Sequence, residues 1–256
     1  MEIQQIRNAT LIIEFAGKRF LVDPMLSAKD SLPPFAGTPN DHKRNPLVEL
    51  PIGLDDITNV DAVIVTHTHL DHWDGAAADT LPKTLPLFVQ HEADAGKIRE
   101  AGFTDIRLLS ENSSFDDIAL IKTPGQHGSD EAMRRLGDRL GEVCGVVFRH
   151  PAEETLYLAG DTVWNDDVAD NLSRHAPGVV ILNCGDAQIN GIGSIIMGRA
   201  DLLEVSNAAP RANIVATHME AVNHAVLTRQ ELKTFAATSG IESRVHVPND
   251  GETLRF

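Results

Sequence analysis

The sequence predicts an α/β fold in which a central sheet is covered by helices. Many short runs of aliphatic and β-branched residues have the length and composition of strands, and amphipathic helical stretches lie between several of them. Both signals occur in both halves of the chain, which is typical of layered α/β proteins. No linker, low-complexity tract or strict repeat interrupts the pattern, so we expect residues 1–256 to form a single domain.

The first elements are three strand-like runs, "EIQQI", "TLIIEF" and "KRFLVD". Ala16 and Gly17 separate the last two in the manner of a hairpin turn, so we expect an antiparallel meander here. The same segment has polar and charged residues where a secretory signal peptide needs a continuous apolar stretch. We therefore expect a cytoplasmic protein.

Residues 24–56 follow without a regular pattern. Strand pairing across this segment is prevented by five prolines: Pro33, Pro34, Pro39, Pro46 and Pro51. A loop this long in a compact chain is usually a lid, a binding loop or an interface. We expect one of these roles, with plain disorder as the alternative.

The rest of the chain contains nine strand-like runs and four helical stretches, which lie between several of the runs. The strand-like runs are "DAVIVT", "PLFVQ", "IRLL", "IALIKT", "EVCGVVFRH", "TLYLAGD", "GVVILNCGD", "NIVATH" and "SRVHVP". The helical stretches are "EADAGKIREAG", "NDDVADNLSRH", "MGRADLLEVSNAA" and "TRQELKTFAATSG".

Residues of metal-binding type follow four of these strands. "DAVIVT" leads into His67, "IALIKTPGQ" into His127, "TLYLAG" into Asp161 and "NIVAT" into His218. Imidazole nitrogen and carboxylate oxygen are donors that suit zinc, manganese or ferrous iron, and strand ends hold such donors rigidly. Any one histidine taken alone is more often a surface or core residue, but the four together indicate a metal site.

The stretch "HTHLDHWDG", residues 67–75, places three imidazoles and two carboxylates in nine positions. Polar side chains this dense after an apolar strand are costly unless something binds them. In an extended turn His67 and His69 point the same way and can hold one ion, whereas Asp71 and His72 would face a second. We therefore predict two divalent ions, Zn, Mn or Fe, completed by three later residues: His127, His218 and the bridging Asp161.

"HTHLDHWDG" also fits the H-x-H-x-D-H signature of the metallo-β-lactamase fold superfamily, which this sequence resembles. His127, Asp161 and His218 follow in the order of that superfamily, and "FLVD" resembles its first motif, which ends here at Asp23. The resemblance covers nearly the whole chain. It implies a four-layer αββα sandwich of two pseudo-symmetric halves, with the metals at one edge of the sheets.

The resemblance further implies how the ligands divide: His67, His69 and His127 hold the first ion, Asp71, His72 and His218 the second, and Asp161 bridges them. Asp23 would orient a ligand or bound water from outside the coordination sphere. Asp74 extends the signature to H-x-H-x-D-H-x-D, which resembles the branch of L-ascorbate-6-phosphate lactonase and N-acylphosphatidylethanolamine phospholipase D. In "THMEAVNHAVLTRQEL", the segment from His218 to His224 is similar to H-x-E-x-x-x-H segments of that branch.

This branch implies metal-assisted hydrolysis by a bridging hydroxide near Asp161, with Asp71 taking up the proton. His224 is the candidate proton donor or substrate contact. A lactone or related ester is the leading substrate class and a phosphodiester the alternative. An iron-dependent oxidoreductase or a non-catalytic metal-binding protein is the alternative of another class. His69 counts against the oxidoreductase, because the flavodiiron members have glutamate there.

The net charge of the chain limits the classes of binding partner that we expect. Lys and Arg number 22 against 37 Asp and Glu, a formal net charge of −15, which argues against nucleic acid or an anionic membrane as the main partner. No apolar run reaches the roughly 18 residues of a spanning helix. We expect a small-molecule substrate, and assembly into a homo-oligomer stays open.

Overall fold

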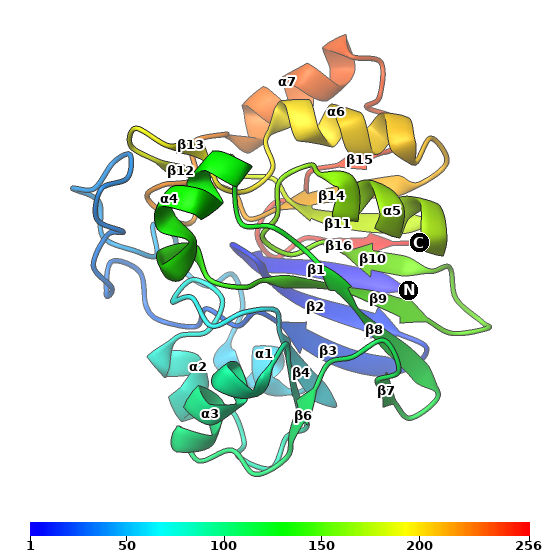
Figure 1. Ribbon diagram of the computed structural model, residues 1–256. Helices are drawn as coiled ribbons and strands as arrows, with labels where there is room; N and C mark the ends of the chain where they lie inside the picture. Colours follow the sequence, from blue (N-terminus) through cyan, green and yellow to red (C-terminus); the bar gives the residue numbers. More distant parts are fainter.

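Two seven-stranded sheets lie face to face in the computed structural model, which describes residues 1–256 (Figure 1). The first sheet has the order β16-β1-β2-β3-β4-β5-β6. Its strands are β1 (Glu2–Arg7), β2 (Thr10–Phe15), β3 (Lys18–Val22), β4 (Ala62–Val65), β5 (Leu87–Val89), β6 (Ile106–Leu108) and β16 (Thr253–Arg255). Ala16 and Gly17 join β2 to β3, which confirms the predicted hairpin.

The second sheet has the order β15-β14-β11-β10-β9-β8-β7. Its strands are β7 (Ser114–Phe115), β8 (Ile118–Pro124), β9 (Cys144–Arg149), β10 (Leu156–Leu158), β11 (Val179–Asn183), β14 (Asn213–Thr217) and β15 (Val245–His246). In both sheets an antiparallel group, β1–β3 or β7–β10, is followed by parallel strands. The two halves therefore repeat one pairing pattern.

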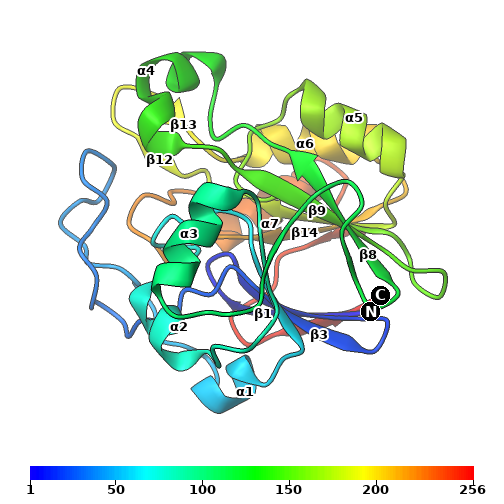
Figure 2. The same cartoon turned by 60° about the horizontal axis from the view of Figure 1, so that its bottom comes forward.

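Helices cover the outer faces of both sheets. The first sheet carries α1 (Leu54–Thr58), α2 (Gly75–Thr80) and α3 (Glu92–Glu100), and the second carries α5 (Asp166–His175), α6 (Arg199–Ala208) and α7 (Arg229–Thr238) (Figures 1 and 2). α4 (Asp130–Leu140) and the hairpin of β12 (Gln188–Ile189) and β13 (Gly193–Ser194) lie together beyond the sheets (Figure 2).

Three large apolar clusters fill the spaces between these layers. One joins the sheets, with Phe20 of β3 packed edge-on against Phe148 of β9 at 5.4 Å between ring centroids. The second joins the second sheet to α5–α7, and the third joins the first sheet to α1–α3. The order helix, sheet, sheet, helix confirms the expected αββα sandwich. None of its helices has both the length and the apolar character needed to cross a membrane.

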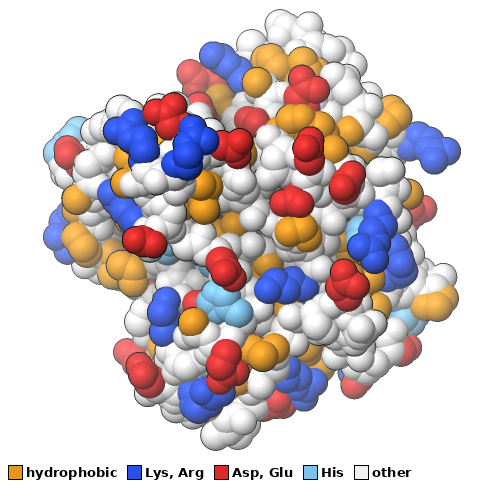
Figure 3. Space-filling model, in the orientation of Figure 1, with side chains coloured by type: hydrophobic (Ala, Val, Ile, Leu, Met, Phe, Trp, Pro, Cys, Tyr) orange, Lys and Arg blue, Asp and Glu red, His pale blue; other side chains and the backbone are white.

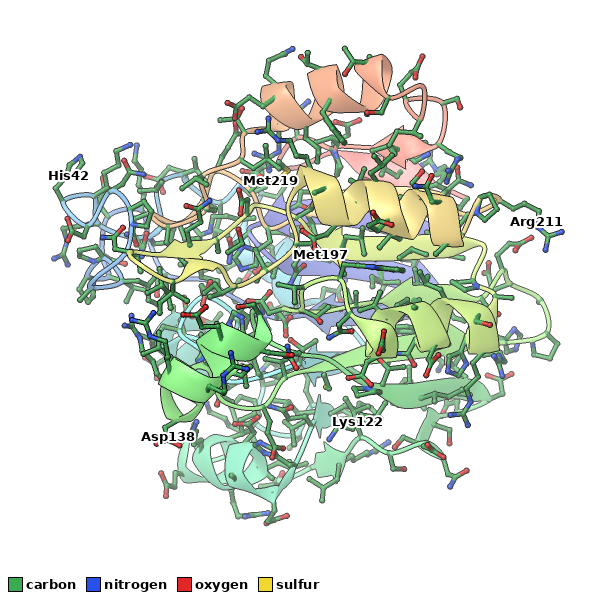
Figure 4. All side chains as sticks on the ribbon, turned by 45° about the horizontal axis from the view of Figure 1, so that its top comes forward. His42, Lys122, Asp138, Met197, Arg211 and Met219 are labelled. Atoms are coloured by element: carbon green, nitrogen blue, oxygen red, sulfur yellow. The ribbon has the colours of Figure 1, made fainter.

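The Pro-rich segment is shorter than predicted. From Pro24 to Gly53 it contains no helix and no strand apart from an isolated bridge between Leu32 and Asn45. Leu54–Thr58 form α1, so the expected end at residue 56 is wrong. The turn forms because it buries Ile57 against the first sheet. The loop projects from one end of the molecule, with His42 at its outer end (Figure 4).

Candidate metal centre

The strands that precede the predicted ligands all end at the same edge of the two sheets. β4 leads to His67, β8 to His127, β10 to Asp161 and β14 to His218. The other three ligand candidates, His69, Asp71 and His72, lie in the turn between β4 and α2. All seven side chains are buried except that of His69, which is partly exposed.

Their donor atoms fall into three overlapping groups. Within each group the atoms lie within 4.8 Å of one another, and the groups are His67/His69/His127, His67/His72/Asp161 and Asp71/His72/His218. The first and last groups have the composition implied for the two ions. The middle group places Asp161 beside one histidine from each of these two groups, His67 and His72.

Asp161 Oδ2 faces imidazoles of both groups. It lies 3.1 Å from His72 Nε2, 3.6 Å from His127 Nε2 and 3.8 Å from His218 Nε2. Asn183 Nδ2, at the end of β11, donates to the other oxygen, Oδ1, at 2.6 Å. One oxygen is thus held by the protein while the other is directed between the two groups.

Asp23 orients His72 and the chain before it. Its Oδ2 accepts hydrogen bonds from Thr66 Oγ1 at 2.8 Å and from His72 Nδ1 at 2.9 Å, and its Oδ1 accepts from the Thr66 N–H at 2.7 Å. This leaves His72 Nε2 facing the cluster. Asp23 and His218 both have left-handed backbone conformations, with φ of 44° and 61°, that turn the chain sharply at the ends of their strands.

Burial and neighbouring charges shift the pKa values of the cluster in opposite directions. Burial, together with the nearby His72 and His69, holds the pKa of His67 well below its usual range. Burial also opposes charge on His72, but the carboxylates around it, above all Asp161, outweigh this and raise its pKa well above the usual range. Burial favours protonation of Asp161, yet His72 and His218 keep its pKa well below the usual range. The carboxylates are therefore ionised, as metal ligands must be.

The donor set fits divalent metal ions. His72 and His218 approach within 3.2 Å through their Nε2 atoms, and His67 Nε2 lies 3.0 Å from His69 Nδ1. Lone pairs that converge this closely from five imidazoles and two carboxylates require cations or shared protons between them. Nitrogen and carboxylate oxygen donors suit zinc, manganese and iron.

A cavity of about 280 Å³ opens beside the cluster. His69, Asp71, His127 and Asp161 contribute to its lining. Much of the remainder is apolar: Phe35, Leu70, Leu140, Ile189 and Ile195. Arg139 is the one Lys or Arg in the lining. The centre thus faces a small, mostly uncharged space.

His224 lies in this cavity lining, in the turn before α7 rather than on a helix. Its ring packs edge-on against Phe35, and its Nδ1 is buried without a hydrogen-bond partner. Burial lowers its pKa to about 4. The neighbouring Glu220 instead forms an ion pair with Arg229 at 2.7 Å and is not part of the lining.

Asp74 makes its hydrogen bonds to the backbone and not to a ligand side chain. Its Oδ1 accepts from the Ala77 N–H at 2.8 Å and caps α2, and its Oδ2 accepts from the Ser27 N–H at 2.8 Å. It therefore connects α2 to the start of the Pro-rich loop. This helix begins immediately after the turn that carries His69, Asp71 and His72. By capping the helix, Asp74 fixes the C-terminal end of that turn.

Two asparagines of the site were not predicted. Asn183 ends a strand, β11, at the same edge as the ligands, and this position in the sequence could have indicated a role in the site. Asn8 Nδ2 donates to the Asp71 carbonyl at 3.0 Å and lies 3.4 Å from His218 Nε2, but nothing in "IRNAT" marks it.

The fold and the donor cluster together define a metal-binding αββα protein with a cavity at its metal centre. The family model described as "Beta-lactamase superfamily domain" matches residues 18–219. UPF0173 protein YddR of Bacillus subtilis is 48% identical over 257 residues, which cover 100% of both chains. The chain belongs to the beta-lactamase superfamily and, within it, to the UPF0173 family.

Two solved structures are similar over their full length. Isothiocyanate hydrolase from Delia radicum gut bacteria is 49% identical, with a TM-score of 0.97 and coverage of 100% of this chain and 99% of that chain. A possible metal-dependent hydrolase from Veillonella parvula is 45% identical, with a TM-score of 0.98 and the same coverage.

Proposed function

We propose that this protein is a metal-dependent hydrolase of small uncharged molecules, with an isothiocyanate as its first substrate class. The observation that carries the proposal is the seven-donor cluster beside a largely apolar cavity of about 280 Å³. That volume lies at the small end of ligand sites. The similarity to an isothiocyanate hydrolase, 49% identical over the whole chain, supports this substrate.

The chemistry proposed is the addition of water to the central carbon of R–N=C=S. When bound by the two ligand groups, two divalent ions would supply an acidified water and polarise the substrate. The water oxygen bonds to carbon, the C–N bond breaks, and both water protons end on nitrogen, which gives an amine and carbonyl sulfide. Asp71 takes up the first proton, and the hydrogen bond from Asn183 holds Asp161 in its orientation. His224, a neutral imidazole at pH 7, contacts the substrate.

A lactone is the second candidate substrate. Its carbonyl carbon undergoes the same attack, and an uncharged ring suits the apolar lining. The branch that the extension to Asp74 resembles contains a lactonase and also a phospholipase D, so that resemblance supports a lactone and a phosphodiester equally. A phosphodiester suits the cavity less well, because Arg139, the one cationic side chain there, already donates to the Ala36 carbonyl at 2.9 Å.

The surface supports a small molecule rather than a polyanion as partner. Basic side chains are interspersed with acidic ones on the face in Figure 3, and the net charge of the chain is −15. Such a surface does not attract nucleic acid or an anionic membrane.

The test is turnover by metal-reconstituted protein on allyl isothiocyanate, a γ-lactone and bis(4-nitrophenyl) phosphate. We expect amine and carbonyl sulfide in equal amounts from the first, and loss of at least about 100-fold in rate in an Asp161→Asn variant, which removes the charge but not the volume. Lactone hydrolysis alone would favour the second candidate. Phosphodiester hydrolysis alone would overturn both.

A further inference from the structure

Three segments that lie far apart in the sequence meet at the cavity beside the metal centre. They are the Pro-rich loop, the C-terminal end of α4 and the β12–β13 hairpin (Figure 1). Arg139 Nη2 of α4 donates to the Ala36 carbonyl at 2.9 Å, and the Asn190 N–H of the hairpin donates to the Gly37 carbonyl at 3.0 Å. The loop is thus tied to both of its neighbours at adjacent residues.

Asn223 fixes the same part of the loop from inside. Its buried side chain accepts from the Phe35 N–H at 2.9 Å and from Asn45 Nδ2 at 3.0 Å, and it donates to Thr38 Oγ1 at 2.9 Å and to the Pro39 carbonyl at 2.8 Å. All four hydrogen bonds of this amide are made to the Pro-rich loop, three of them to residues 35–39 and one to Asn45. A polar side chain this fully satisfied in a buried position specifies one loop conformation.

The loop conformation places one aromatic side chain in the cavity. The Phe35 ring packs edge-on against His224, with centroids 4.6 Å apart and an interplanar angle of 65°. Phe35 is the one Phe, Trp or Tyr in the lining, which it shares with Leu70, Leu140 and two isoleucines. Because Asn223 precedes His224 directly, one turn of chain positions both rings.

We infer that Phe35 is the specificity-determining residue of the site, that it receives an uncharged aryl or alkyl group of the substrate, and that Asn223 is its positioning residue. This inference rests on the proposed function, and it specifies the organic group R of the substrate, which the proposed function does not define. An apolar group gains by leaving water for this lining, and an aromatic group gains further from edge-to-face contact with Phe35. An anionic group would lose its hydration there, and Arg139, the one Lys or Arg in the lining, already donates to the Ala36 carbonyl.

The test compares methyl isothiocyanate with 2-phenylethyl isothiocyanate on the metal-loaded protein. Phe35→Ala should lower kcat/KM for the phenylethyl substrate by about 10- to 100-fold through KM, and leave the methyl substrate within about threefold. Phe35→Leu should restore part of the loss. Asn223→Asp, which keeps the acceptor but removes both donors, should reduce the same preference. Leu108→Ala, a change at an exposed side chain outside the cavity lining, is the control.

Binding of 2-phenylethanethiol and ethanethiol to the zinc-loaded protein, measured by calorimetry, separates this inference from the proposed function. Thiolates bind zinc, so both ligands place their organic group in the cavity without any turnover. Loss of the preference for phenylethyl in Phe35→Ala would support the inference even if no isothiocyanate is hydrolysed. An unchanged preference in that variant would overturn it, whatever the protein hydrolyses.

Discussion

Asn183 shows how one uncharged side chain can set the geometry of a charged cluster. Its Nδ2 holds Asp161 Oδ1 at 2.6 Å, so that Oδ2 is directed toward the imidazoles. Without this hydrogen bond the carboxylate could rotate about its Cβ–Cγ bond and align with either group alone. Partners of this kind, outside the coordination sphere, commonly change metal affinity by about 10- to 100-fold.

We therefore expect Asn183→Leu, which keeps the approximate volume, to weaken zinc binding by about 10- to 100-fold in a chelator competition assay. The matched control is Asn171→Leu. Asn171 is also buried and donates through Nδ2, but to Tyr157 Oη at 3.4 Å on the outer side of the second sheet. Equal zinc affinities of Asn183→Leu and Asn171→Leu would contradict the positioning role.

His224 should make the stability of the protein sensitive to acid. Burial lowers its folded pKa to about 4, below the usual 6.5, so the unfolded chain binds the proton more readily. The stabilising effect of the neutral form is complete above about pH 6.5 and is lost as the pH falls toward 4. His224→Leu should therefore lose less unfolding free energy than the parent between pH 7 and 5, as measured by urea denaturation. A parallel loss in both proteins would show that other groups dominate.

At the scale of single residues, the sequence predicted the metal-binding types and, through the family resemblance, Asp23 as a support, but it missed the other supports. His67, His127, Asp161 and His218 could be found because each follows an apolar strand and because imidazole and carboxylate are ligand groups. Asn8 and Phe35 could not, since their partners lie 210 and 189 positions away along the chain, at His218 and His224. Such contacts depend on the tertiary fold rather than on local pattern.

At the scale of elements, α2 depends on a carboxylate that also holds a loop. Asp74 caps the helix at Ala77 and binds the buried Ser27 N–H, both at 2.8 Å. Arg7, fully buried in β1, reinforces the same loop by donating to the carbonyls of Met25, Ser27 and Val48. The turn that carries His69, Asp71 and His72 therefore ends in a helix whose first residues are held to the loop.

Asp74→Ala should lower the free energy of unfolding by about 2–4 kcal/mol, because it removes a helix cap and leaves a buried N–H unpaired. Asp74→Asn should cost less, since one acceptor oxygen can still cap the helix. Asn165→Ala is the matched control: it removes the cap of α5 at Val168 but no second contact, and it should cost about 1 kcal/mol. Equal losses for Asp74→Ala and Asn165→Ala in urea denaturation would show that the bond to Ser27 contributes nothing.

Sequence patterns missed the helices α1, α2 and α4, of which α4 is the longest. Within Asp130–Leu140 the buried residues are Ala132 and Leu140, and Leu136 departs from helical geometry. Ala132, Leu136 and Leu140 recur every four residues and form a narrow apolar stripe, which is set among charged residues. The helix is supported by its Ser129 cap and by apolar contacts with the β12–β13 hairpin, which begins 48 residues after the helix ends.

At the scale of the whole molecule, the arrangement of two sheets explains why the ligands meet. Each half has antiparallel strands followed by parallel ones, and the carboxyl ends of β3, β4, β10, β11 and β14 reach one edge. Strand and helix patterns predicted the layers, but not their number or the pairing of the halves. The αββα order followed from the resemblance carried by "HTHLDHWDG", because hydrophobic periodicity does not encode which sheet a strand joins.

Because ligands come from both sheets, bound metal should stabilise the protein as a whole. At a free zinc concentration 100 times the dissociation constant, linkage gives about 2.7 kcal/mol. For a chain of this length that corresponds to a rise in Tm of roughly 5–10 °C over the chelator-treated protein. A double variant, His67→Gln with His72→Gln, removes at least one donor from each of the three groups, and it should abolish most of the shift. His42→Ala, at the outer end of the loop, should retain it. A single calorimetric transition that moves with metal would indicate that the two sheets unfold together, whereas a shift confined to one of two transitions would show that the centre stabilises one half alone.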